Sequence, residues 1–174
     1  MKNHHKSVNE MSSGGKLFFS RIFPLIFIVI GGSVGAFGTR NLIRAKASTE
    51  WPSVQGEIIK SFVDRKESHD SDGRHSTTYH AEIQYNYSVD NSDFTGDRVA
   101  YGDYGSSDPS HAREVVSRYP TGRKVAVYYM PGKPAESLLE TGIKGQSFFL
   151  PIFGLVFFSV GLFMAVKLPG TLKK

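Results

Sequence analysis

The chain has 174 residues, of which 40% are hydrophobic, and a formal net charge of +5. It contains no cysteine, which excludes disulfide bonds, thiolate metal sites and a cysteine nucleophile. The positive charge is unevenly distributed, because residues 45–144 carry twelve Lys or Arg against fifteen Asp or Glu, and the remaining residues carry nine against Glu10 alone. A nucleic-acid-binding protein would concentrate Lys and Arg on its folded domain, so we expect no nucleic-acid partner.

An uncharged apolar stretch between Arg21 and Arg40 is the first predicted element. A helix needs about 20 apolar residues to cross the hydrocarbon core of a bilayer. The stretch reaches this length when the apolar residues from Leu17 onward are included and Arg21 extends its guanidinium to the interface. These features predict a transmembrane helix at 17–39, after a basic tail at 1–16.

The helix is predicted to continue beyond the bilayer as a juxtamembrane extension at 40–50. An alternative interpretation takes residues 1–36 as a cleaved signal peptide, with a basic region, a short apolar region and small residues at the cleavage site. Against this alternative, apolar character continues through Phe37. A cleaved product would keep one C-terminal span.

The segment 51–142 is predicted to be a β-rich domain. Its clearest signal is at 79–89, where apolar and polar residues alternate, so that one face of a strand points to a core and the other to water. Asp90 and Asn91 supply turn chemistry, and 94–101 is predicted as the returning strand. Further strands are predicted at 54–63, 124–130 and 137–140.

One helix interrupts the strands, between Asp108 as a good N-cap and Pro120 as its end. Its apolar residues recur at helical spacing on one side. About five strands and one short helix predict a small, mainly antiparallel barrel or sandwich. We therefore expect an α+β membrane protein in which two transmembrane helices flank this domain.

The second uncharged stretch, at 145–166, is long enough to cross a membrane outright and precedes a basic tail at 167–174. The central segment is longer than about 60 residues, so the positive-inside rule gives more weight to the tails. We expect a multi-pass protein of the cell membrane, with the lipid bilayer as partner. Both termini are expected in the cytoplasm and the β domain outside.

Glycines in both spans predict close helix packing. Gly31 and Gly35 form a small-xxx-small pair, and Gly154 and Gly161 lie on about the same face of the second span. The spans are expected either to pack on each other or to form the seam of a homo-oligomer. Neither span carries an ionisable residue at depth, which argues against an ion pathway.

A set of short segments follows in a fixed order along residues 50–142, namely Trp51-Pro52, Tyr85-Asn86-Tyr87, Phe94-Thr95-Gly96, Gly102-Asp103-Tyr104, Tyr119-Pro120-Thr121-Gly122 and the run at 125–129. The set resembles the bacterial membrane family known as domain of unknown function 3592. This resemblance implies a β-rich domain between helices in the bacterial cytoplasmic membrane. It brings no established activity, catalytic residue or cofactor.

The segment 66–80 contains side chains that bind divalent metals, His69, Asp70, Asp72 and His75. Their spacing matches no closed zinc site, and the calcium-loop pattern is incomplete. The composition also fits a polar hairpin loop. We therefore expect no metal and no other cofactor.

The loop 101–108, which leads into the helix, is the second candidate site. Its residues expected to contact a ligand or partner are Gly102, Asp103, Tyr104, Gly105 and Ser106. A helix N-terminus can hold an anion, but Asp103 and Asp108 would repel phosphate. Hydrolase chemistry would need Ser106 or Ser107 activated by His111, and the Gly-x-Ser-x-Gly motif is absent.

The sequence therefore favours a non-catalytic, membrane-anchored β module that contacts a protein or the envelope. The alternative is a membrane-bound enzyme, or a metal or ligand sensor, that uses the segments 66–80 and 101–108.

Overall fold

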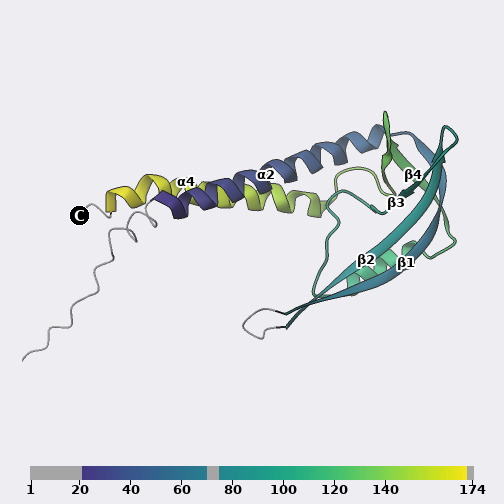
Figure 1. Ribbon diagram of the computed structural model, residues 1–174, viewed down its shortest axis with the longest axis horizontal. Helices are drawn as coiled ribbons and strands as arrows, with labels where there is room; N and C mark the ends of the chain where they lie inside the picture. Colours follow the sequence, from purple (N-terminus) through teal and green to yellow (C-terminus); the bar gives the residue numbers. More distant parts are fainter. Residues whose placement is uncertain (1–20, 70–74, 172–174) are drawn as a thin grey trace, which may run out of the picture. The chain divides into compact units, whose positions relative to one another are not determined.

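A computed structural model describes residues 21–69 and 75–171 (Figure 1). The chain divides into two compact units. One comprises the residues up to Thr39 and those from Phe149 onward, and the other is Arg40–Phe148. The first unit is helical, and the second contains the β-sheet.

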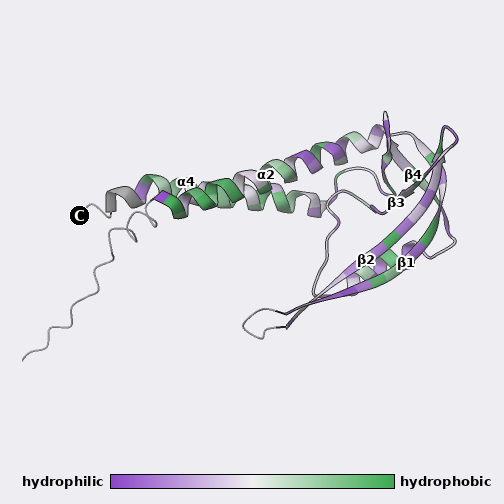
Figure 2. Cartoon of the chain, viewed as in Figure 1, coloured by the Kyte–Doolittle hydropathy of each residue, from purple (hydrophilic) through white to green (hydrophobic). Residues whose placement is uncertain are grey.

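The helical unit is built from α2 (Phe23–Ala47), which continues into the second unit, and α4 (Phe149–Thr171). At 1.5 Å per residue, the two helices are about 37 and 34 Å long. Within the described residues, the segments Phe23–Glu50 and Gly145–Lys167 are long and apolar enough to cross a membrane. Figure 2 shows the apolar residues along both helices. Residues 17–20 of the first predicted span lie outside the described residues.

The last turns of α2 pack against the β domain. Ala45 is fully buried, and Arg44 Nη1 lies 3.1 Å from Glu136 Oε1. Ser48, at the start of the short 3-10 helix η2 (Ser48–Glu50), accepts a 3.1 Å hydrogen bond from the Gly142 N–H. Residues 40–47 therefore continue the helix, as predicted, and they contact the β domain.

The domain contains one five-stranded antiparallel sheet with the strand order β3-β2-β1-β4-β5. Its strands are β1 (Ser53–His69), β2 (His75–Val89), β3 (Ser92–Gly96), β4 (Lys124–Met130) and β5 (Lys133–Leu138). The helix α3 (Ser110–Arg118) follows β3, and the 3-10 helix η3 (Gly145–Phe148) precedes α4.

The core lies on the face of the sheet that α3 covers. Tyr85 and Tyr87 of β2 point into it, and polar neighbours separate them, as the alternation at 79–89 predicts. Asp90 and Asn91 have positive φ angles of 50° and 62°, which a tight hairpin turn requires. The buried core residues are Ile58, Ile83, Tyr85, Tyr87, Val89, Val99, Val115, Val127 and Leu139.

The predicted barrel or sandwich is wrong, because the strands form a single open sheet. Hydrogen bonds join the segments that follow the two edge strands, β3 and β5. The N–H groups of Leu139 and Glu140 donate to the Val99 carbonyl at 3.1 and 2.8 Å. The predicted strand at 94–101 is also wrong beyond Gly96, because the carbonyls of Arg98 and Val99 bond to residues 139–140 instead of to β2. The strand β5 begins earlier than the predicted 137–140.

The prediction of a loop at 66–80 is wrong for most of its length. The strands β1 and β2 stay paired as far as His69 opposite His75 (Figure 1). The ladder between β1 and β4 ends at Glu57, so the two strands continue beyond it as a hairpin. We call residues 60–69 and 75–84 the arm.

Candidate functional site

The loop 101–108 is held by β2 of the arm. Tyr79 and Ser106 exchange two backbone hydrogen bonds of 2.8 and 3.1 Å. Gly105 lies against the His80 ring, so closely that a Cβ on Gly105 would be 2.1 Å from His80 Cε1. Gly105 therefore allows the loop to approach the strand, which is a structural role.

Gly102 marks a turn of the same loop. Its φ angle is +87°, a conformation that favours glycine, and a Cβ there would lie 2.8 Å from Ser147 Oγ. Ser147 is buried, and its hydroxyl donates a 3.0 Å hydrogen bond to the Tyr101 carbonyl. Gly102 thus lets the loop pack on η3.

Asp103 and Tyr104 both contact His111 in the first turn of α3. Asp103 Oδ1 lies 3.1 Å from His111 Nε2, and the Tyr104 ring stacks on the His111 ring with centroids 4.9 Å apart. Sequence reasoning considered His111 only as a hydrolase base. Its position in the first turn of the predicted helix could have indicated that it lies beside the loop that precedes this helix.

The serine that a hydrolase would need is part of the helix start. Ser106 Oγ accepts a 3.1 Å hydrogen bond from the Asp108 N–H. Asp108 Oδ1 in turn accepts hydrogen bonds from the hydroxyl and the N–H of Ser110, at 2.7 and 2.9 Å, and these bonds lower the pKa of Asp108. These hydrogen bonds fix the loop where it enters α3. The predicted N-cap at Asp108 is wrong by one residue, because Pro109 is the N-cap of α3 and has no side-chain cap hydrogen bond.

Of the four predicted metal ligands, the structure describes two, His69 and His75. His69 and His75 face each other across the arm with ring centroids 4.5 Å apart. Asp70 and Asp72 lie outside the described residues. Within the described part of the chain, no group of three or more His, Cys, Asp or Glu side chains is placed to hold a metal ion.

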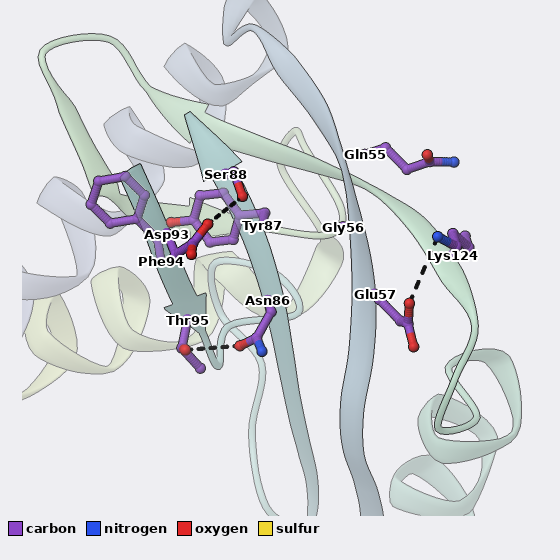
Figure 3. A pocket seen from close by; sticks show the side chains of 10 residues that line it. All are labelled: Gln55, Gly56, Glu57, Asn86, Tyr87, Ser88, Asp93, Phe94, Thr95 and Lys124. Atoms are coloured by element: carbon purple, nitrogen blue, oxygen red, sulfur yellow. Dashed lines mark hydrogen bonds and ion pairs between the residues drawn. The ribbon is translucent and has the colours of Figure 1, made fainter. Parts of the chain in front are cut away.

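A hollow of about 440 Å³, which sequence reasoning missed, lies on the sheet (Figure 3). It is lined by residues of four strands, Gln55, Gly56, Glu57, Asn86, Tyr87, Ser88, Asp93, Phe94, Thr95 and Lys124. Asn86 and Ser88, which line the hollow, are polar positions of the predicted strand at 79–89. The sequence did not indicate which strands lie beside this one. Two pairs of polar side chains are hydrogen-bonded there, Ser88 with Asp93 at 2.6 Å and Thr95 with Asn86 at 2.9 Å, and Lys124 forms an ion pair with Glu57 at 3.8 Å.

Glu140 connects the end of α3 to the segment that leads into α4. Its Oε1 contacts Arg118 Nη1 at 2.5 Å and the Tyr119 hydroxyl at 3.0 Å, and its Oε2 contacts Lys144 Nζ at 3.0 Å. Burial alone would raise the pKa of Glu140, but the hydrogen bonds from Lys144 and Tyr119 and the nearby cations lower it overall. Burial and the Glu140 charge raise the pKa of Tyr119 to about 12. Glu140 is therefore charged at neutral pH and acts as a structural link.

The four glycines predicted for helix packing lie at the contact between α2 and α4. A Cβ on Gly31 would be 2.4 Å from the Phe158 backbone nitrogen. One on Gly154 would be 2.3 Å from the Gly35 nitrogen, and one on Gly161 would be 2.8 Å from the Ile28 nitrogen. The obstructing atoms are backbone, so the helices approach closely because these residues lack side chains.

The fold is an α+β domain with an open antiparallel sheet, joined to two helices of membrane-spanning length. The family model described as "Domain of unknown function (DUF3592)" matches residues 54–144, and the chain belongs to this family. No curated protein matches the chain. The match covers the sheet, α3 and the arm.

Proposed function

We propose that the protein is a two-pass protein of the bacterial cytoplasmic membrane whose β domain is a non-catalytic contact site for another protein. The helices α2 and α4 have the length and composition of bilayer spans. The basic tails support an orientation with both termini in the cytoplasm and the domain outside.

The single observation that carries this proposal is the arm. Among the described residues, β1 has hydrogen-bonded neighbours on one side only from Lys60 onward, since its ladder to β4 ends at Glu57 and the backbone of Ile58 bonds to Gly122 and Arg123. A strand edge of this length offers a row of unpaired N–H and C=O groups to another chain. Phe62, with 40% of its surface exposed, adds an apolar contact beside it.

The polar groups elsewhere support a non-catalytic role. Asp103, His111 and Ser106 fix the loop and the start of α3, and Glu140 links two segments of the domain. In the helical unit, the glycine faces are occupied by the other helix of the same chain. This favours packing of the two spans on each other over a homo-oligomer seam formed by their glycines.

Photo-crosslinking in intact membranes tests the proposed contact site. With p-benzoylphenylalanine in place of Phe62, we expect covalent adducts of higher mass, because the arm contacts a protein there. The same residue in place of Thr95, which lines the hollow and is also exposed, is the matched control and should give no adduct. Equal yields at both positions, or no adduct at Phe62, would contradict the proposal.

A further inference from the structure

The open edge of β1 carries an ordered set of charges. Asp64, Arg65, Lys66 and Glu67 follow one another as negative, positive, positive, negative. Arg65 Nη2 lies 2.7 Å from Glu67 Oε1, and Lys66 Nζ lies 3.8 Å from Asp64 Oδ2. The side chains of Arg65, Lys66 and Glu67 are each more than half exposed. Both ion pairs therefore remain available to a chain that binds alongside.

The other edges of the sheet are already engaged. β3 and β5 approach each other, and the Tyr85 hydroxyl contacts both the Arg98 carbonyl and Ser137 Oγ between them. β5 also carries Pro134, which cannot donate a backbone hydrogen bond. On the far side of the arm, β2 is bonded at Tyr79 to the loop 101–108. Among the described strands, the outer edge of β1 is the longest one left open.

We propose that this edge pairs with the same edge of a second copy of the chain, in antiparallel orientation, about a two-fold axis at Arg65. The proposal rests on the contact site proposed above and names its partner. The axis must pass through a residue position, because residues directly opposite each other in an antiparallel pair point to the same face. An axis between Arg65 and Lys66 is excluded on this ground.

The charges distinguish the remaining positions of the axis. An axis at Val63 places Lys60 opposite the partner's Lys66. An axis at Asp64 places two carboxylates opposite each other, and it brings no pair of opposite charges directly across from each other, because Arg65 then lies opposite the partner's Val63. Like charges directly opposite destabilise a strand pair. An axis at Phe62 would place the partner's Lys66 opposite Ile58. That position is not free, because the backbone of Ile58 is already bonded to Gly122 and Arg123.

An axis at Arg65 satisfies the charges on both faces. On one face, Asp64 of each copy lies opposite Lys66 of the other copy. Together with the ion pair within each chain, the two aspartates and two lysines form a neutral cluster of four alternating charges. On the other face, the two Arg65 side chains are opposite each other, but each has its own Glu67 at 2.7 Å and the partner's Glu67 on the diagonal. This axis pairs residues 61–69, whereas an axis at Lys66 pairs only 63–69 within the described strand.

The absence of cysteine in the natural chain makes disulfide trapping a direct test. With full-length protein in membranes under mild oxidation, Arg65→Cys should form a disulfide-linked dimer. The two Cα atoms at the axis would be about 4.5–5.5 Å apart, which suits a disulfide. Ser68→Cys is the matched control on the same arm, since its two copies would be about 20 Å apart along the strands and should not crosslink. We expect at least about a fivefold difference in dimer yield, a factor that corresponds to about 1 kcal/mol.

Charge reversal provides an independent readout. In the Arg65→Cys background, Asp64→Lys places like charges opposite each other and should reduce the dimer several-fold, and Asp64→Lys with Lys66→Asp should restore it. Equal yields for Arg65→Cys and Ser68→Cys would overturn the proposal, and a maximum at Lys66→Cys would overturn the proposed axis. If Arg65→Cys stays monomeric while the photo-crosslinker at Phe62 captures a different protein, the second copy is ruled out and the contact site stands. If neither variant gives an adduct, both proposals fail.

Discussion

Gly31→Ala is expected to disrupt the packing of α2 on α4. The added methyl carbon would lie 2.4 Å from the Phe158 nitrogen, 2.8 Å from the Gly154 carbonyl oxygen and 2.9 Å from the Phe157 carbonyl carbon. All three are backbone atoms, so the helices must separate to accommodate it. Overpacking of this kind costs about 1–3 kcal/mol. The measurement is the temperature at which the full chain in detergent micelles loses its resistance to a protease.

The adjacent residue provides the matched control. A Cβ on Gly32 would meet only the Phe158 side chain, at 3.8 Å, which is an ordinary contact. Alanine also favours the helix over glycine by about 1 kcal/mol. Gly32→Ala should therefore leave the transition unchanged or raise it. Equal effects of the two substitutions would show that α2 and α4 do not pack through Gly31.

Tyr85→Ala is expected to destabilise the β domain by about 3–5 kcal/mol, as removal of a large buried aromatic does. The Tyr85 side chain is fully buried, and its hydroxyl contacts the Arg98 carbonyl at 3.0 Å and Ser137 Oγ at 3.1 Å. Burial raises the pKa of this hydroxyl, so it stays neutral and able to donate. The substitution therefore removes core volume and a bond between the two edges of the sheet. Denaturant unfolding of the full chain, followed by far-ultraviolet circular dichroism, measures the loss.

Two variants separate these contributions. Tyr85→Phe keeps the ring and removes the hydroxyl, which leaves buried partners unsatisfied and should cost about 1–3 kcal/mol. Tyr104→Ala removes a tyrosine that is 50% exposed and stacks on His111, and should cost no more than about 1.5 kcal/mol. If Tyr85→Ala were no more destabilising than Tyr104→Ala, the core described for this face of the sheet would be wrong.

The strand β2 could be predicted from its alternation of apolar and polar residues, because one of its faces is buried and the other is exposed to solvent. The strand predicted at 54–63 lies within β1, although a bulge between Ile58 and Lys60 interrupts the alternation there. Alternation failed only at 64–69 and 75–78 of the arm, where the polar residues resemble a loop in sequence although they form strands. The residues Val99, Ala100 and Tyr101 suggested a strand because they are apolar, yet all three are buried in a segment that leaves the sheet.

The candidate site was only partly accessible from the sequence. The loop 101–108 was selected for its glycines, and the structure explains Gly102 and Gly105 by close approach to Ser147 and His80. Those neighbours are distant in sequence, so no local pattern predicts them. The open edge of β1 was inaccessible for the same reason, because a strand's free side depends on which strands pair with it.

Cysteine labelling in intact cells tests the two-pass arrangement most directly. A membrane-impermeant maleimide should label Thr95→Cys from outside and should label Lys174→Cys only after lysis. Ser7→Cys should behave like Lys174→Cys and stay in the full-length product, whereas cleavage of a signal peptide would remove it. Labelling of Thr95→Cys and Lys174→Cys from the same side would contradict the account, since α4 would then not cross the membrane.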